Sequence, residues 1–378
     1  MSRHFSARSI RPEAQRLFRR AQRLHEQSRF WEAARLYIQA ASRAQSQPDL
    51  RARAYLGAAH ALRLVGRFRQ ALGCYTRAQG IASVAAQEDL AVDALVGGAM
   101  ALRALGRLEE AHAQFSAALA FYQGHRDEEG RAYVLWGLGG LLRLKGDFLA
   151  AQAHLEEALE ICTRTGQPEA EAYVRCALGG LSRMRGAYEA SLEQYERADG
   201  LMRRNGDLFG QAYAACGVAN AHRMLAHWDE ALRCFARAQE LYRQIGDRVS
   251  YAYTLWGEGT LWKVRGELDA ARWRFREATA LFRATQDNRG LAYAYLGLAE
   301  LALLEGRARG RARRYVQAAW DRANRHGYRF ERLHAELLTL CLEGERSQEV
   351  EGRLRAAYRA CGSGWLENQE LALPLNIP

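Results

Sequence analysis

The feature that most constrains this chain is a residue pattern that returns every forty positions through most of its length. A glycine recurs in one column of the pattern, and only Ala226 interrupts that column: Gly66, Gly106, Gly146, Gly186, Gly266 and Gly306. An alanine recurs twelve positions later: Ala78, Ala118, Ala158, Ala198, Ala238, Ala278 and Ala318. Self-similarity at a fixed period of this length predicts an array of helical repeats, in which each repeat packs on its neighbours.

Each copy has the pattern of two amphipathic helices joined by a tight turn. Residues 132–166 illustrate it, with the turn at 145–147. The first helices carry a column of small residues, and the second helices carry a column of aromatic residues or leucine. This arrangement predicts that large side chains pack against small ones where helices approach closely. Between copies, pairs such as Gly206-Asp207 combine a residue suited to ending one helix with a residue suited to capping the next.

The order of these residues resembles the tetratricopeptide repeat family: a small residue, a turn glycine with a large residue two positions later, and then alanine, an aromatic residue and alanine. The forty-residue period is similar to the branch of that family with longer helices. The resemblance covers residues 12–326. It implies an all-α fold, a right-handed superhelical solenoid of about eight helix-turn-helix repeats with a C-terminal helical cap.

Four regions are expected along the chain. Residues 1–11 are predicted to be a mobile basic arm, residues 12–326 the solenoid, residues 327–361 the capping helices and residues 362–378 a tail. The predicted turns of the solenoid lie near Ser28, Gly66, Gly106, Gly146, Gly186, Ala226, Gly266 and Gly306. The tail has two open interpretations. It is frayed or packed on the cap, or its apolar part, 365–377, docks on the body as a displaceable segment.

Composition narrows the classes of function. The net charge of +11 favours acidic partners. The seven cysteines form no CxxC pair, which favours thiols in a reducing cytoplasm. The N-terminus lacks the apolar stretch of a signal peptide, and no run is long enough to span a membrane. No HExxH motif or recognisable Ser/His/Asp arrangement is present. We therefore expect a cytoplasmic protein that is not an enzyme, with no metal, cofactor or membrane partner.

A second face of the first helices carries the candidate binding residues, and the family resemblance implies that this face lines a concave groove. Its basic column is Arg63, Arg103, Arg143, Arg183, Arg223 and Lys263. Its aromatic column is Tyr133, Tyr173, Tyr213, Tyr253 and Tyr293, with Trp136 and Trp256 between the two columns and Asn220 and Glu300 one turn further on. Repeat duplication, ion pairing within the repeats and tyrosine packing in the helix seam are the structural explanations of the same columns.

Guanidinium groups form bidentate bonds with carboxylates, and aromatic side chains are common in binding hot spots. In similar tetratricopeptide adaptors an extended partner segment lies in the groove. The leading prediction is therefore a protein-interaction scaffold that binds an acidic extended peptide. The alternatives are a ligand- or peptide-responsive regulator that acts through another chain, and a protein that binds single-stranded nucleic acid. Self-association also stays open.

Overall fold

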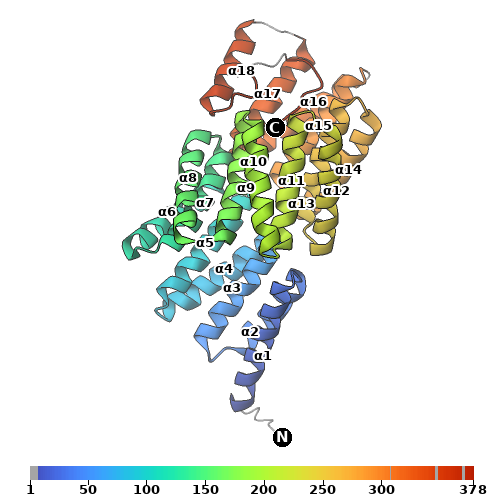
Figure 1. Cartoon of the computed structure of the whole chain (residues 1–378). Helices are drawn as coiled ribbons and strands as arrows, with labels where there is room; N and C mark the ends of the chain where they lie inside the picture. Colours follow the sequence, from blue (N-terminus) through green and yellow to red (C-terminus); the bar gives the residue numbers. More distant parts are fainter. Residues whose placement is uncertain (1–6, 307, 345–347, 368–370) are drawn as a thin grey trace. The chain divides into compact units, whose positions relative to one another are not determined.

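The computed structural model describes residues 7–306, 308–344, 348–367 and 371–378, and within them it contains 18 α-helices and no strand (Figure 1). The prediction of an all-α repeat fold is confirmed. The chain divides into two compact units. Unit 1 comprises residues 1–127 with 245–247, and unit 2 comprises residues 128–244 with 248–378.

Unit 1 contains the first six helices of the chain. They are α1 (Ala7–Glu26), α2 (Phe30–Arg43), α3 (Pro48–Leu64), α4 (Phe68–Val84), α5 (Glu88–Ala104) and α6 (Leu108–His125). Each of these helices packs on the next one along the chain. The predicted basic arm at 1–11 falls partly on residues 1–6, which lie outside the described residues, and α1 begins at Ala7.

Unit 2 contains the remaining twelve helices. They are α7 (Glu128–Lys145), α8 (Phe148–Thr165), α9 (Pro168–Arg185), α10 (Tyr188–Arg204), α11 (Leu208–Met224), α12 (Trp228–Ile245), α13 (Arg248–Val264), α14 (Leu268–Thr285), α15 (Asn288–Leu304), α16 (Arg309–His326), α17 (Arg329–Glu343) and α18 (Gln348–Ala360). No helix in the described part of the chain is long and apolar enough to cross a membrane.

The turns within repeats use the left-handed backbone conformation. Gly146 ends α7 with a φ of 75°, and the Asp147 N–H donates back to the Leu142 carbonyl at 3.0 Å. The Asp147 side chain then accepts from the Ala150 N–H at 3.1 Å and caps α8. Glycine adopts this conformation without steric cost. Ala226 adopts it too, with a φ of 59°, so the turn is kept even where the glycine column is interrupted.

Close helix packing depends on glycines that face large rings. Tyr195 of α10 is 4% exposed and lies between two such glycines, Gly179 of α9 and Gly217 of α11. A Cβ atom at Gly179 would lie 2.8 Å from the Tyr195 ring, and one at Gly217 would lie 2.1 Å from it. Both separations are too short for carbon atoms, so these positions exclude any larger residue without repacking.

The odd-numbered helices of unit 2 form one layer. Helix α9 contacts α7 and α11, and α13 contacts α11 and α15. Helix α17 contacts α15, next to it in the layer, and also α7, the first helix of the unit. The rings of Phe148, which opens α8, and Phe330 of α17 lie 5.2 Å apart. The described residues of the tail, 362–367 and 371–378, lie against one surface of α9, α11, α13 and α15. We call this surface the inner face of unit 2.

The packing around Tyr195 generates a first prediction. Gly217→Ala should lower the free energy of unfolding, because overpacking costs about 1–3 kcal/mol, whereas alanine gains only about 1 kcal/mol of helix propensity over glycine. The ring cannot move away, since Gly179 lies on its other side. Urea denaturation followed by circular dichroism measures the change.

Gly200→Ala is the matched control. This glycine lies within α10, and an added Cβ there would meet only the end of the Arg204 side chain, at 3.7 Å. The control should be neutral or slightly stabilising. Equal effects of the two substitutions would contradict the packing argument.

Candidate functional site

The predicted basic column is divided between the two units. Arg63 and Arg103 lie in α3 and α5 of unit 1. The other four cations lie in four successive odd-numbered helices of unit 2: Arg143, Arg183, Arg223 and Lys263. Unit 2 therefore contains the part of the column whose geometry can be followed from one helix to the next.

Arg223 is completely buried beside the C-terminal segment. Its Nε and Nη2 donate to Asn220 Oδ1 at 3.3 and 3.2 Å, and Nη2 also donates to the Ile377 carbonyl at 2.9 Å. Its Nη1 donates to Asn376 Oδ1. Burial, reinforced by the nearby charge of Arg183, lowers the pKa of Arg223 to about 9. The guanidinium is still charged at neutral pH, yet all three acceptors are neutral.

Lys263 and Glu300 form a buried ion pair on the adjacent helices α13 and α15. Their side chains are 1% and 0% exposed. Burial lowers the pKa of Lys263, and Glu300 opposes that shift. Both partners bind the main chain of one residue: the Leu375 N–H donates to Glu300, and Lys263 Nζ donates to the Leu375 carbonyl at 2.8 Å.

These contacts show that the segment 371–378 docks on the body of unit 2. The Asn376 carbonyl accepts from Trp365 Nε1 at 3.1 Å, and Asn376 Nδ2 donates to the Arg223 carbonyl at 3.2 Å. Leu375 and Ile377 are each 3% exposed. Earlier in the tail, Ser363 Oγ donates to the Met184 carbonyl at 2.6 Å. The structure combines the two interpretations that the sequence left open: Trp365 packs on the cap, and the segment 371–378 docks on the body.

Two other arginines of the column lack a carboxylate. Arg143 Nη1 contacts the Met184 sulfur at 3.5 Å, and burial, with a contribution from Arg289, lowers the pKa of Arg143. The Nε and Nη1 atoms of Arg183 are buried and have no hydrogen-bond partner. Each such group loses its hydration without full compensation.

Counting charges shows a surplus of positive charge on this layer. Arg289 of α15 pairs with Glu331 of α17 at 2.6 Å, and Lys263 pairs with Glu300. In the basic column of unit 2, Arg143 of α7, Arg183 of α9 and Arg223 of α11 have no carboxylate partner among the described residues. Two of these three, Arg183 and Arg223, lie on the helices of the inner face, which therefore carries positive charge that its own carboxylates do not neutralise.

The tyrosine column has more than one role. The Tyr173 hydroxyl donates to Asp207 at 2.6 Å, and the Tyr253 hydroxyl donates to Asp287 at 3.2 Å. These two aspartates are N-caps, which accept from the Gly210 and Gly290 N–H groups at 2.9 and 2.7 Å. Each of these tyrosines thus ties one repeat to the cap of the next, which is a structural role.

The other aromatic residues of the site fall into two groups. Tyr133 is 37% exposed and stacks on Trp136, with ring centroids 5.7 Å apart. Trp256 and Tyr293 are buried, with ring centroids 4.7 Å apart. Tyr213 is half-buried. Only the first pair therefore offers an aromatic surface to a large ligand.

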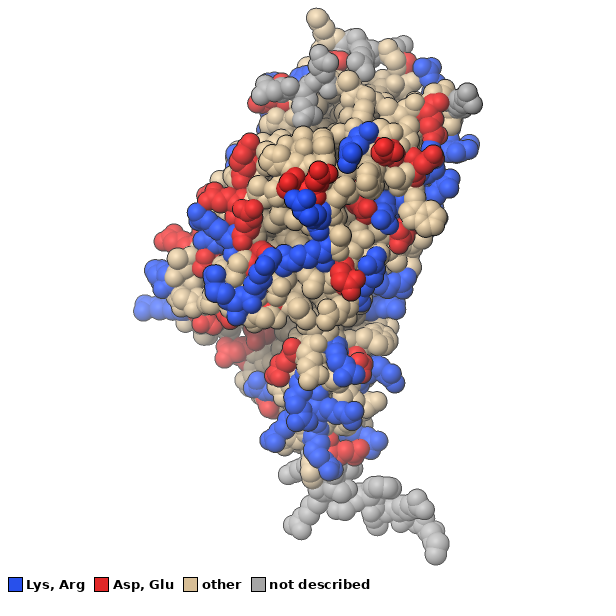
Figure 2. Space-filling model, turned by 45° about the vertical axis from the view of Figure 1, so that its right-hand side comes forward, with Lys and Arg blue, Asp and Glu red and all other residues tan. Residues whose placement is uncertain are grey.

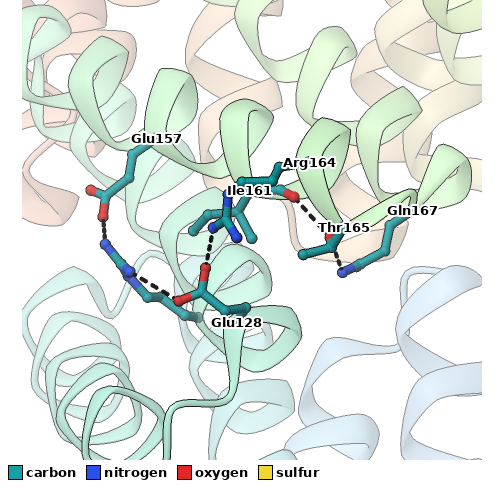
Figure 3. A network of polar contacts seen from close by, with 7 residues as sticks. Glu128, Glu157, Ile161, Arg164, Thr165 and Gln167 are labelled. Atoms are coloured by element: carbon teal, nitrogen blue, oxygen red, sulfur yellow. Dashed lines mark hydrogen bonds and ion pairs between the residues drawn. The ribbon is translucent and has the colours of Figure 1, made fainter.

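Arginines elsewhere in unit 2 are paired differently. Figure 3 shows Glu128, at the start of α7, accepting from Arg164 and from Arg131, and Arg131 also pairs with Glu157 of α8. On the face drawn in Figure 2, basic and acidic side chains are interspersed. Arg131 and Arg164 thus bind carboxylates, which distinguishes them from Arg143, Arg183 and Arg223 of the basic column.

Several residues of this site were not among the sequence candidates. Arg289 and Glu331 were missed because neither residue occupies the repeat position that defines the basic column. Asn376 was missed because the tail carries no repeat pattern. Within the described residues, no group of three or more His, Cys, Asp or Glu side chains could hold a metal ion. All seven cysteines are free thiols.

Comparisons with known proteins agree with this architecture. Residues 130–198 match a family model described as the tetratricopeptide repeat. The crystal structure of a Rap protein complexed with Competence and Sporulation Factor is 12% identical, has a TM-score of 0.57, and is matched over 92% of this chain and 99% of that one. No curated protein matches the sequence.

A second solved structure shares the fold. The Rap conjugation gene regulator of the plasmid pLS20, in complex with the Phr* peptide, is 18% identical with a TM-score of 0.60. The match covers 70% of this chain and 72% of that one. The family match and these structures confirm the resemblance to tetratricopeptide repeat proteins, and at these identities the structures inform the fold alone.

The tyrosine-to-cap hydrogen bond can be tested by removing one oxygen. Tyr173→Phe should destabilise the protein by about 1 kcal/mol, because Asp207 loses one of its donors in a partly buried position. Tyr133→Phe is the control, since Tyr133 is partly exposed and stacks through its ring. Urea denaturation measures the free energy of unfolding of each variant. Equal stability of the two variants would contradict the structural role of the Tyr173 hydroxyl.

His334 of α17 links the cap to the tail and predicts a pH effect. Its ring is buried, stacks on Trp365 at 5.0 Å, and has Nδ1 2.8 Å from the Tyr358 hydroxyl. Burial lowers the pKa of His334 from 6.5 to about 4. The unfolded chain therefore binds a proton more readily, so the stability from the neutral ring is present above pH 6.5 and is lost as pH falls towards 4.

The expected loss from this residue between pH 7 and pH 5 is about 2 kcal/mol. Denaturant titrations at both pH values measure it, with His334→Gln as the comparison. The variant should lose less stability on acidification than the wild type. An identical pH dependence of the two proteins would contradict a lowered pKa of His334 in the folded state.

Proposed function

Because the chain contains tetratricopeptide repeats, we propose that it is a peptide-binding scaffold that holds an acidic extended segment of a partner protein on the inner face of unit 2. One observation carries this proposal. The inner face holds the chain's own segment 371–378 through hydrogen bonds donated by Arg223 and Lys263 and one accepted by Glu300. A surface that binds one extended segment in this way has the donors and acceptors to bind another.

The contacts to the main chain of that segment are largely independent of its sequence. Leu375 is bound at both its N–H and its carbonyl, and Ile377 is bound at its carbonyl. Such bonds give affinity for any extended chain, while the side-chain environment selects among chains. The surplus positive charge supplies that selection, since arginine forms its strongest hydrogen bonds with carboxylates.

The two structural neighbours support the peptide part of the proposal. One is described as a complex with the Phr* peptide, and the other as a complex with Competence and Sporulation Factor. A regulator that responds to a peptide and acts through another chain is consistent with the same site. In that case the peptide would compete with the segment 371–378.

Single-stranded nucleic acid is the less favoured ligand. Non-specific binding of a single strand needs several exposed rings on which successive bases stack. Here Trp256 and Tyr293 are buried, and Tyr253 is engaged with Asp287. Of the predicted aromatic columns in unit 2, Tyr133 alone is exposed, which is too little for a run of stacked bases.

A library of immobilised ten-residue peptides tests the proposed function. The full-length protein should select peptides that contain Asp or Glu, and Arg183→Gln should reduce that selection. Arg233→Gln is the matched control, because Arg233 is an exposed arginine that pairs with Glu230 at 3.0 Å on α12. Circular dichroism should show equal helicity for all three proteins.

The control should bind the same peptides as the wild type. Selection of no peptide, or equal selection by Arg183→Gln and the wild type, would reject an acidic ligand on the inner face. Oligonucleotide binding with a steep salt dependence would favour the nucleic-acid alternative instead.

A further inference from the structure

The residue that the tail places against Arg223 is an asparagine, and the surroundings of its side chain suit a carboxylate better. Asn376 Oδ1 accepts from Arg223 Nη1. The other acceptors of that guanidinium are Asn220 Oδ1 and the Ile377 carbonyl. A fully buried cation thus meets three neutral oxygens, whereas a buried charge is ordinarily paired with an opposite charge.

A second unneutralised cation lies close to the first. Arg183 is near enough to Arg223 to contribute to the lowering of its pKa, and two of its nitrogens are buried without a hydrogen-bond partner. Two nearby guanidinium groups repel each other, and an anion bound to Arg223 would offset that repulsion. No carboxylate among the described residues pairs with either arginine.

The register of the bound segment is fixed on both sides of Asn376. Lys263 and Glu300 bind the main chain of Leu375, and Arg223 binds that of Ile377. The side chains of Leu375 and Ile377 are buried. Main-chain contacts of the two neighbouring residues therefore set the position of residue 376. Its polar side chain lies between two apolar side chains, and it is the group by which the site can select one segment over another.

We propose that this position is a seat for an aspartate on an extended segment of a partner protein, and that the tail occupies it with an uncharged asparagine as a displaceable competitor. This inference rests on the proposed function and specifies its ligand as an aspartate flanked by apolar residues. An aspartate keeps the size of the asparagine and adds the charge that the two arginines lack.

An aspartate in place of Asn376 would lose one hydrogen bond, and this loss is smaller than the gain from the new pair of opposite charges. Asn376 Nδ2 donates to the Arg223 carbonyl at 3.2 Å, and a carboxylate cannot do so. That carbonyl retains the Ala226 N–H as a donor, at 3.3 Å. A hydrogen bond from a charged donor to a charged acceptor exceeds a neutral one by enough to give about tenfold in affinity. The tail compensates for its weaker contact because it is tethered and so has a high effective concentration.

Two synthetic peptides and three full-length proteins test the proposal. The peptides are acetylated, amidated copies of residues 371–378, one with the natural asparagine at the sixth position and one with aspartate there. The proteins are the wild type, Asn376→Asp and Asn376→Lys. The lysine variant places a second cation against Arg223 and should release the tail, while the aspartate variant should hold the tail more firmly.

Calorimetry should show that the aspartate peptide binds Asn376→Lys about tenfold more tightly than the asparagine peptide. Binding of the aspartate peptide should weaken from Asn376→Lys to the wild type and again to Asn376→Asp. The preference for aspartate should shrink in Asn376→Lys when Arg183→Gln is added. It should also decline as the pH falls below about 4, where the carboxyl of the free peptide becomes protonated.

Hydrogen exchange supplies a readout that needs no added peptide. The amides of the segment 371–378 should exchange more slowly in Asn376→Asp than in the wild type, and faster in Asn376→Lys. Equal binding of the two peptides to Asn376→Lys, or faster exchange in Asn376→Asp, would overturn the aspartate seat.

If neither peptide binds Asn376→Lys with normal helicity, the aspartate seat is also overturned. The peptide library then separates the two proposals. Library peptides that still bind through Arg183 leave the scaffold function standing, and their absence removes it as well.

Discussion

The structure depends on the close approach of neighbouring repeats, which requires a glycine wherever a large ring crosses the helix seam. Tyr195 lies between Gly179 and Gly217, and a Cβ at either glycine would overlap the ring. Because this packing brings successive odd-numbered helices together, it also brings their polar side chains together. Arg183 on α9 and Arg223 on α11 interact through their charges for this reason.

Burying these arginines without carboxylates costs free energy that the repeat core must offset. The chain already relieves part of this cost with the segment 371–378, whose Ile377 carbonyl and Asn376 side chain accept hydrogen bonds from Arg223. Lys263 and Glu300 contribute differently, since they neutralise each other and orient the main chain of Leu375. Affinity and selectivity are thus assigned to different residues of one surface.

The repeat core could be predicted from the sequence because its contacts are local and recur. The glycine at 146, its capping Asp147 and the close approach at Gly179 all follow from residue columns. The site was only partly predictable. Arg223 and Lys263 stand in a visible column, but their partners in the tail, Asn376 and Leu375, lie more than a hundred residues away in a segment without repeats. The hydrogen bond from Tyr173 to the helix N-cap Asp207 could not be predicted, because the same column contains both structural and exposed tyrosines.

The contact between α17 and α7 has a mechanical consequence for unit 2. An open solenoid behaves like a spring, whose pitch changes when small rotations add up from coil to coil. Here the ring contact between Phe148 and Phe330 joins the first helix pair to the cap, so the coils between them cannot stretch independently. Elastic extension of this unit therefore requires the release of this contact and of the tail contacts that join the cap to α9, α11, α13 and α15.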